Sequence, residues 1–167
     1  TLEDQVRDLA VNGGEIYAGG FAVASANIEG SGTFQGTALA TEAFIVELAD
    51  GASATIPWGQ WLGGTGQNEA VQDVVVLGDE IYVGGQLAGT PGVESVASFA
   101  GTLAGLEGFV AEIADDDIGH IPSITWGQWL GGTATDVVWT VAITGDEIYA
   151  GGAAYESFSM EDPASFQ

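Results

Sequence analysis

Apolar and polar residues follow short β-type patterns along this chain, without the spacing and caps that an amphipathic helix needs. The segment VQDVVVL (71–77) is rich in β-branched residues and runs through Gly-Asp into EIYVGGQL (80–87), which is the pattern of a tight hairpin. Apolar and polar residues partly alternate in AFIVELA (43–49) and GFVAEIA (108–114), and IPWGQWL (56–62) runs into Gly-Gly. These segments predict strands, so the expected fold class is all-β.

The same motifs recur at nearly equal intervals, which is typical of a repeat protein. GGEIYAGG (13–20), GDEIYVGG (78–85) and GDEIYAGG (145–152) are versions of one strand. Its paired glycines predict a β-bulge or the close approach of a neighbouring backbone. A Gly-, Ser- and Thr-rich connection follows, and it contains a short FQGT (34–37) or FAGT (99–102) element.

Division after each WLGG gives two full units, 1–64 and 65–132, and a partial unit, 133–167. Each full unit is predicted to hold four antiparallel strands, and a repeat of this length is typical of a β-propeller blade. The partial unit holds the two inner strands of such a blade and leaves an exposed strand edge. Because SFQ (165–167) aligns with TFQ (33–35), we expect further chain, or other protein subunits, to complete this partial propeller at both ends.

Five motifs follow one another from the second unit into the third: FAGT (99–102), GFVAEI (108–113), WGQWLGG (126–132), Asp136 and GDEIYAG (145–151). This order resembles the SBBP-type β-propeller repeat, a family of extracellular repeats of bacteria and archaea. Glu47 and Glu112 stand where that family usually has Lys, and its Asp after the first strand is here part of a shorter Gly-Asp turn. The resemblance implies propeller blades in an extracellular protein and implies little about chemistry, because one fold hosts many activities.

The chain is strongly acidic, with 24 Asp and Glu residues against one basic residue, Arg7, and a formal net charge of −23. Such a surface repels phosphate backbones and anionic membrane faces, so neither nucleic acid binding nor membrane insertion is expected. Dense carboxylates need salt or divalent cations for screening. This need indicates an extracellular or cell-surface location. The absence of Cys excludes a disulfide framework and leaves the compartment open.

Asp115, Asp116 and Asp117 form an acidic turn between the last two predicted strands of the second unit. Carboxylate oxygens are ligands that Ca²⁺ prefers, so this turn is the first candidate for a calcium site. The spacing of an EF-hand loop is not met, however, and no Glu closes the turn. A solvated acidic turn without a metal is the favoured interpretation.

A second column of carboxylates consists of Asp4, Glu69 and Asp136, one at the entrance to each innermost strand. Asp136 is therefore a further candidate Ca²⁺ ligand. The alternative is that each carboxylate caps a turn by accepting backbone N–H bonds. Capping is favoured, because the ligands of one ion would have to converge from neighbouring units.

Aromatic residues provide the candidate ligand contact. Trp58 and Trp61 are three positions apart in a strand and are predicted to point to opposite faces, which favours core packing over a sugar-stacking platform. Trp139 stands where the other units have Arg7 and Gln72. Because it breaks the repeat, Trp139 is the candidate ligand-binding residue, and a glycan is its expected class of ligand.

No motif in the sequence indicates catalysis. His120 is the only His, with no Cys or second His nearby, and it is predicted to lie in a surface turn. The sequence therefore predicts a non-enzymatic structural, adhesive or partner-binding segment of a larger cell-surface or filament protein. A lectin-like carbohydrate-binding module and a scaffold for a polysaccharide-acting enzyme are the alternatives.

Overall fold

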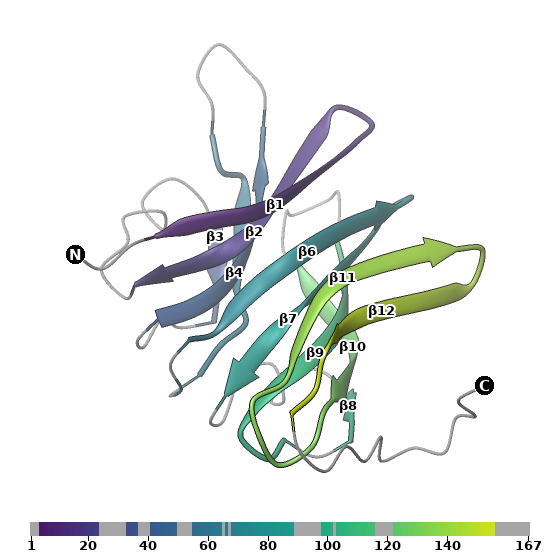
Figure 1. Ribbon diagram of the computed structural model, residues 1–167. Coiled ribbons are helices and arrows are strands. Elements are labelled where there is room, and N and C mark those ends of the chain that lie inside the picture. The colour runs from purple at the N-terminus through teal and green to yellow at the C-terminus, as the bar shows by residue number, and fades with distance from the viewer. Residues whose placement is uncertain are drawn as a thin grey trace.

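The computed structural model describes residues 4–23, 33–36, 41–49, 55–64, 66, 68–88, 98–101, 103–115 and 122–155. These residues form twelve strands and no helix, which confirms the all-β class (Figure 1). No helix that could cross a membrane occurs among them.

The first sheet is built from unit 1–64. β1 (Gln5–Asn12), β2 (Glu15–Val23), β4 (Thr41–Leu48) and β5 (Trp58–Trp61) pair antiparallel in that order. β3 (Thr33–Gln35) adds to the outer edge, where it runs parallel to β5. The described part of this unit is therefore a sheet of five strands and of mixed orientation.

The second sheet repeats this arrangement. β6 (Ala70–Leu77), β7 (Glu80–Ala88), β9 (Leu106–Ala114) and β10 (Ser123–Leu130) are antiparallel neighbours. β8 (Ser98–Ala100) again lies parallel to the last of them. The four predicted antiparallel strands are present in both units. The prediction is incomplete, because each sheet also has a fifth strand, which is parallel to its neighbour.

The FQGT and FAGT elements form these extra strands, and a glycine on the neighbouring strand makes room for them. Phe34 pairs with Gly59, and a Cβ on that glycine would lie 2.4 Å from the Phe34 ring. Phe99 and Gly127 repeat the contact at 2.2 Å. In both sheets the phenylalanine ring of the FxGT element therefore packs directly on the glycine of the WGQW motif.

The third unit is a hairpin of two described strands, β11 (Val137–Thr144) and β12 (Glu147–Ala153). It corresponds to the two inner strands that the sequence predicts for 133–167. The Gly-Asp turns that join such hairpins need a positive φ at their first residue, which Gly78 (63°) and Gly145 (61°) provide.

The paired glycines confirm the predicted close approach of a neighbouring backbone, whereas the β-bulge lies in the adjacent strand β6. In β7, a Cβ on Gly84 would lie 2.6 Å from Val141 of the next unit, so this glycine permits close sheet packing. A Cβ on Gly85 would lie 2.1 Å from the carbonyl oxygen of Ala70. That second approach occurs at a β-bulge in the adjacent strand β6, where the register shifts between Val71 and Asp73.

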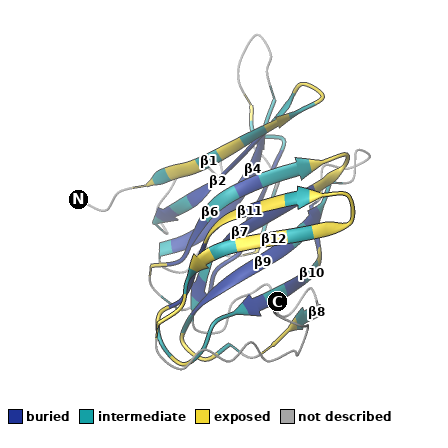
Figure 2. Ribbon diagram, turned by 45° about the vertical axis from the view of Figure 1, so that its right-hand side comes forward, coloured by how far each residue is buried: buried dark blue, intermediate teal, exposed yellow. Residues whose placement is uncertain are grey.

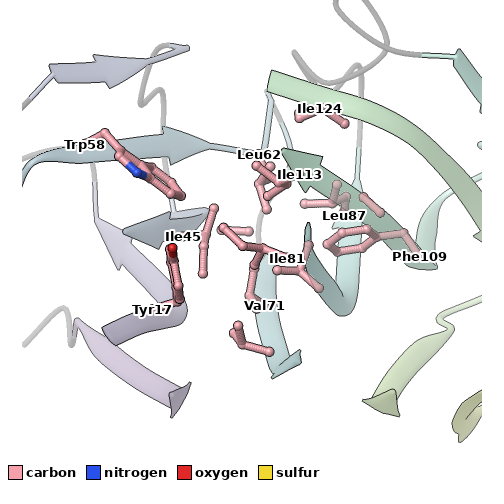
Figure 3. Close-up of a cluster of buried hydrophobic side chains, with 14 of the residues drawn as sticks. Tyr17, Ile45, Trp58, Leu62, Val71, Ile81, Leu87, Phe109, Ile113 and Ile124 are labelled. Atoms are coloured by element: carbon pink, nitrogen blue, oxygen red, sulfur yellow. The ribbon is translucent and has the colours of Figure 1, made fainter. Parts of the chain in front are cut away.

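The three sheets stack face to face. β6 lies against β1, β2 and β4, and β11 lies against β6, β7 and β9, so β1, β6 and β11 are neighbours (Figure 1). Figure 3 shows the largest core cluster, which fills the space between the first two sheets. Trp58 belongs to this cluster and Trp61 to a separate cluster that includes Phe44, which confirms that the two tryptophans point to opposite faces and lie in the core.

Candidate functional site

A pair of buried carboxylates lies at the junction between the first and second units. Glu42 begins strand β4 with Thr41, and Glu69 directly precedes β6; both side chains are fully buried. Each Oε2 lies 2.0 Å from the position that a Cβ on Gly63 would occupy, so the glycine leaves the space that the two carboxyl groups share. We call Glu42 and Glu69 the first carboxyl pair.

Glu69 also binds backbone from both units. Its carboxylate accepts N–H bonds from Gly64 at 3.0 Å and from Ala88 at 3.1 Å. The side chain of Glu69 therefore joins the end of the WLGG segment of the first unit to strand β7 of the second.

The same arrangement recurs one unit later. Glu107 and Asp136 are buried, and their carboxylates flank the Cβ position of Gly131 at 2.2 and 2.3 Å. Asp136 accepts N–H bonds from Gly132 and Tyr155, both at 2.8 Å. We call Glu107 and Asp136 the second carboxyl pair.

Burial raises the pKa of Glu69 to about 7, and the neighbouring Glu42 carboxyl adds to the rise, while the N–H bonds from Gly64 and Ala88 act in the opposite direction. A carboxyl with this pKa is partly protonated near neutral pH and can donate a hydrogen bond to its partner. Because both members of the pair are closed off from solvent, the arrangement fits a structural proton-sharing contact better than a substrate-facing acid and base.

Sequence reasoning finds Asp4, Glu69 and Asp136 but misses their partners Glu42 and Glu107. The missed signal is the Glu that precedes Ala-Phe in the first unit and Gly-Phe in the second, at equivalent repeat positions. Asp4 accepts the N–H of Val23 at 2.8 Å. The backbone bonds of the whole column agree with the capping interpretation.

The candidate calcium residues are only partly within the described chain. Asp115 lies under the first sheet, where its Oδ2 accepts bonds from Trp58 Nε1 at 3.1 Å and Tyr17 Oη at 3.3 Å. Asp116 and Asp117 lie outside the described residues, as does His120. Among the residues that the structure describes, no group of three or more His, Cys, Asp or Glu side chains is placed to hold a metal ion.

The side chain of Tyr17 is buried at this contact. Burial raises the pKa of the Tyr17 hydroxyl well above its usual value, and a hydrogen bond to Glu15 and the charge of Asp115 raise it further. Asp115 of the second unit therefore contacts the first unit through two uncharged donors, the Trp58 indole and the Tyr17 hydroxyl.

The β-bulges form a second candidate site, which we call the bulge row. In β1, β6 and β11 the register skips Arg7, Gln72 and Trp139, respectively. Bulges re-aim side chains and are common beside binding sites. Because the three strands are neighbours, the row brings a cation, an amide and an indole to adjacent strands at the positions where the repeats differ.

The members of the bulge row differ in exposure. Trp139 is 57% exposed, the most suitable of them for a contact with a ligand. The guanidinium of Arg7 lies 5.2 Å from the centroid of the Phe21 ring, a cation–π distance. The structure thus places the predicted contact residue Trp139 at the surface.

Comparisons with known proteins add no family to this description: no protein-family model and no curated protein matches the chain.

Proposed function

We propose that this protein is a non-enzymatic, extracellular structural and partner-binding protein whose sheets are blades of a β-propeller. Face-to-face stacking of sheets that adjoin through their first strands supports this proposal, as does the resemblance of the repeats to SBBP-type propeller sequences. The polar groups that are paired in its interior, Glu42 with Glu69 and Glu107 with Asp136, hold units together.

The observation that carries the proposal is the edge of β12. In the first two sheets the corresponding strands, β2 and β7, pair on their outer sides with β4 and β9. Among the described residues, β12 pairs with β11 alone. An unpaired strand edge is a template for another strand, so the partner that we propose supplies one.

The chemistry of that strand follows from β4 and β9. Both place a buried Glu at their start and buried aromatic and aliphatic residues after it, as in Glu107, Phe109 and Ile113 of β9. A strand of the pattern Glu-small-Phe-aliphatic, without Pro, fits the edge of β12.

A synthetic peptide of the β9 sequence, LEGFVAEIA, tests this proposal. We expect saturable binding of the fluorescent peptide to the intact chain, measured by anisotropy. Two matched controls carry N-methyl groups on alternate amides, one set on each edge of the peptide. A strand pairs with β12 through one edge, so one methylated peptide should bind and the other should not. Equal binding of both controls, or no binding of the parent peptide, would contradict the proposal.

Carbohydrate binding is a second candidate function, and the exposure of Trp139 at its bulge favours it. An exposed indole stacks on the apolar face of a sugar ring. A glycan array probed with the wild-type chain and with Trp139→Ala tests it: glycan binding that the substitution removes supports a lectin-like role, and an array without signal excludes it.

A further inference from the structure

The first strand of each unit carries three apolar residues toward the preceding unit. In β6 these are Val71, Val74 and Val76, which pack against the first sheet. In β11 the equivalent residues Val138, Val141 and Ile143 pack against the second sheet. One way of joining consecutive units is therefore used twice within the chain.

The first unit carries apolar residues at the three equivalent positions, Val6, Leu9 and Val11, and none of them belongs to a core cluster of the described residues. Val6 is 58% exposed, whereas its equivalent Val71 is 0% exposed. Leu9 and Val11 are also more than half exposed. We call Val6, Leu9 and Val11 the head surface.

The surface that receives these apolar residues is the glycine-containing face of the second strand of the preceding unit. In the third unit, at the opposite end of the stack, no described unit packs on this face. Val71 and Val74 pack over Gly19, with Val71 Cγ1 at 2.5 Å from the Cβ position of that glycine. Gly84 receives the next unit in the same way, but a Cβ on Gly151 would meet, within the described part of the chain, only Thr140 of its own hairpin, at 3.1 Å. Figure 2 shows exposed positions along both β11 and β12, whereas β7 and β9 are mostly buried. We call Ala142, Tyr149 and Gly151 the tail surface.

We propose that the head surface of one copy of this chain packs on the tail surface of a second copy, in the geometry that already joins the units within one chain. The contact is heterologous, because head and tail are different surfaces, so repetition builds a ring or a filament. The proposal goes beyond the strand partner of β12, because it uses the face of that hairpin and not its edge.

Polar groups at this contact are compatible with a second copy. Between units, the Asp8 carboxylate accepts the N–H of Val74 at 2.9 Å, and Asp73 accepts the N–H of Val141. The third unit has Thr140 at this position, whose hydroxyl can accept the N–H of Leu9 from the next copy without adding a charge. Because each copy has a formal charge of −23, association requires salt to screen the repulsion.

Disulfide trapping tests the proposal, since the chain contains no Cys. Within the chain, Val74 Cγ2 lies 2.7 Å from the Cβ position of Gly19; Leu9 and Gly151 are the equivalent head and tail positions. The variants Leu9→Cys and Gly151→Cys are mixed in equal amounts at high salt and oxidised mildly. Shortening Leu9 to Cys also frees space for the new side chain at position 151. Mass spectrometry separates the heterodimer from the two homodimers.

We expect the heterodimer to make up clearly more than half of all dimers, which is the share that random pairing of the two variants would give. As a matched control, Asp146→Cys lies in the exposed turn of the same hairpin and should form only a statistical mixture with Leu9→Cys. Adding Val6→Asp to the head variant should lower the heterodimer yield by about tenfold or more, because an unpaired carboxylate is costly in an apolar contact.

Statistical mixtures from both pairs, or homodimers in excess, would overturn the proposal. So would a heterodimer yield that Val6→Asp leaves unchanged. Folding of each variant is checked by circular dichroism, and the exposure of Leu9 makes a folding defect from its substitution unexpected. Binding of the β9 peptide to the head variants separates this proposal from the proposed function, since the head surface lies on β1 and the peptide site on β12.

Discussion

Strands β7 and β12 have almost the same sequence, EIYVGGQLA and EIYAGGA, and opposite surroundings. Tyr82 of β7 is 6% exposed and Tyr149 of β12 is 54% exposed. Both hydroxyls nevertheless donate to the Glu two residues earlier, at 2.7 Å in each case. The local structure of the hairpin therefore depends on its own sequence. Its burial depends on whether another unit packs against it.

The glycines extend this comparison. Gly84 and Gly151 are equivalent. A Cβ on Gly84 would press on Val141 and Val138 at 2.6 and 2.8 Å, whereas a Cβ on Gly151 would meet, among the described residues, only Thr140 of its own hairpin. The repeat thus places a glycine at the stacking position of every unit, including the third, where no other described unit packs on it. Substitutions at equivalent positions should separate what the motif needs for its own fold from what it needs for stacking.

The largest difference is expected between two tryptophans. Trp129→Ala in the second sheet removes a buried ring that packs on Phe99 and Phe109, and should lower the free energy of unfolding by about 4 kcal/mol. Trp139→Ala on the open hairpin should change it by less than about 0.5 kcal/mol. Urea denaturation of both variants measures this difference, and similar losses would show that Trp139 is also a core residue.

The next largest effect concerns the glycines. Gly84→Val should destabilise the chain by about 3 kcal/mol, since the added methyl groups overlap the third unit. In Gly151→Val the added Cβ would meet Thr140 of the same hairpin at 3.1 Å, and the free energy of unfolding should change by less than about 1 kcal/mol. Thermal unfolding monitored by tryptophan fluorescence compares them, and equal destabilisation would contradict the difference in packing.

The carboxyl column provides a smaller, pH-dependent comparison between buried Glu69 and exposed Asp4. The pKa of Glu69 is about 7 in the folded chain against a usual value of 4.5, so the folded state holds this proton more tightly than the unfolded state. The stability that the group contributes is complete below pH 4.5 and is lost as the pH rises through 7.

Between pH 5 and 8 the wild type should therefore lose about 2 kcal/mol through this group. Glu69→Gln, which is neutral throughout, should flatten the dependence of unfolding free energy on pH. Asp4→Asn, at the equivalent and exposed position of the first unit, is the matched control. Denaturant titrations at several pH values test this, and equal slopes for wild type and Glu69→Gln would refute the role of the buried pair.

The smallest expected effect is that of calcium. If the acidic turn that begins at Asp115 binds Ca²⁺, this cation should raise the Tm by about 2 °C more than Na⁺ at equal ionic strength. Asp116→Asn should remove the excess, while Asp79→Asn, in the exposed turn after β6, should not. Equal rises with both cations would mean that screening of the charge accounts for the whole effect.

Much of the fold can be predicted from the sequence because its signals are local. The hairpins follow from the Gly-Asp turns and β-branched runs, and the opposite faces of Trp58 and Trp61 follow from the geometry of a strand. β3 and β8 are missed as strands because three residues show no periodicity and their parallel pairing is non-local. The blade arrangement stays a proposal.

The candidate site is harder to predict, since its partners meet only through stacking. Glu42 and Glu107 stand at the start of strands, where a charged residue is ordinarily exposed. Their burial depends on Gly63 and Gly131, whose missing side chains leave the required space. The exposure of Trp139 was predictable from its break with the repeat, whereas its place at a bulge required the register of β11 and β12.

Glu69 has one further consequence, for how the molecule unfolds. Its carboxylate joins Gly64 of the first unit to Ala88 of the second, so neither unit can open without exposing a group that the other has buried. In a linear array of repeats, such contacts set the nearest-neighbour coupling, and strong coupling makes the array melt as a single cooperative block. Proton uptake at Glu69 therefore affects both units at once. Its protonation should change the cooperativity of the unfolding transition as well as the midpoint.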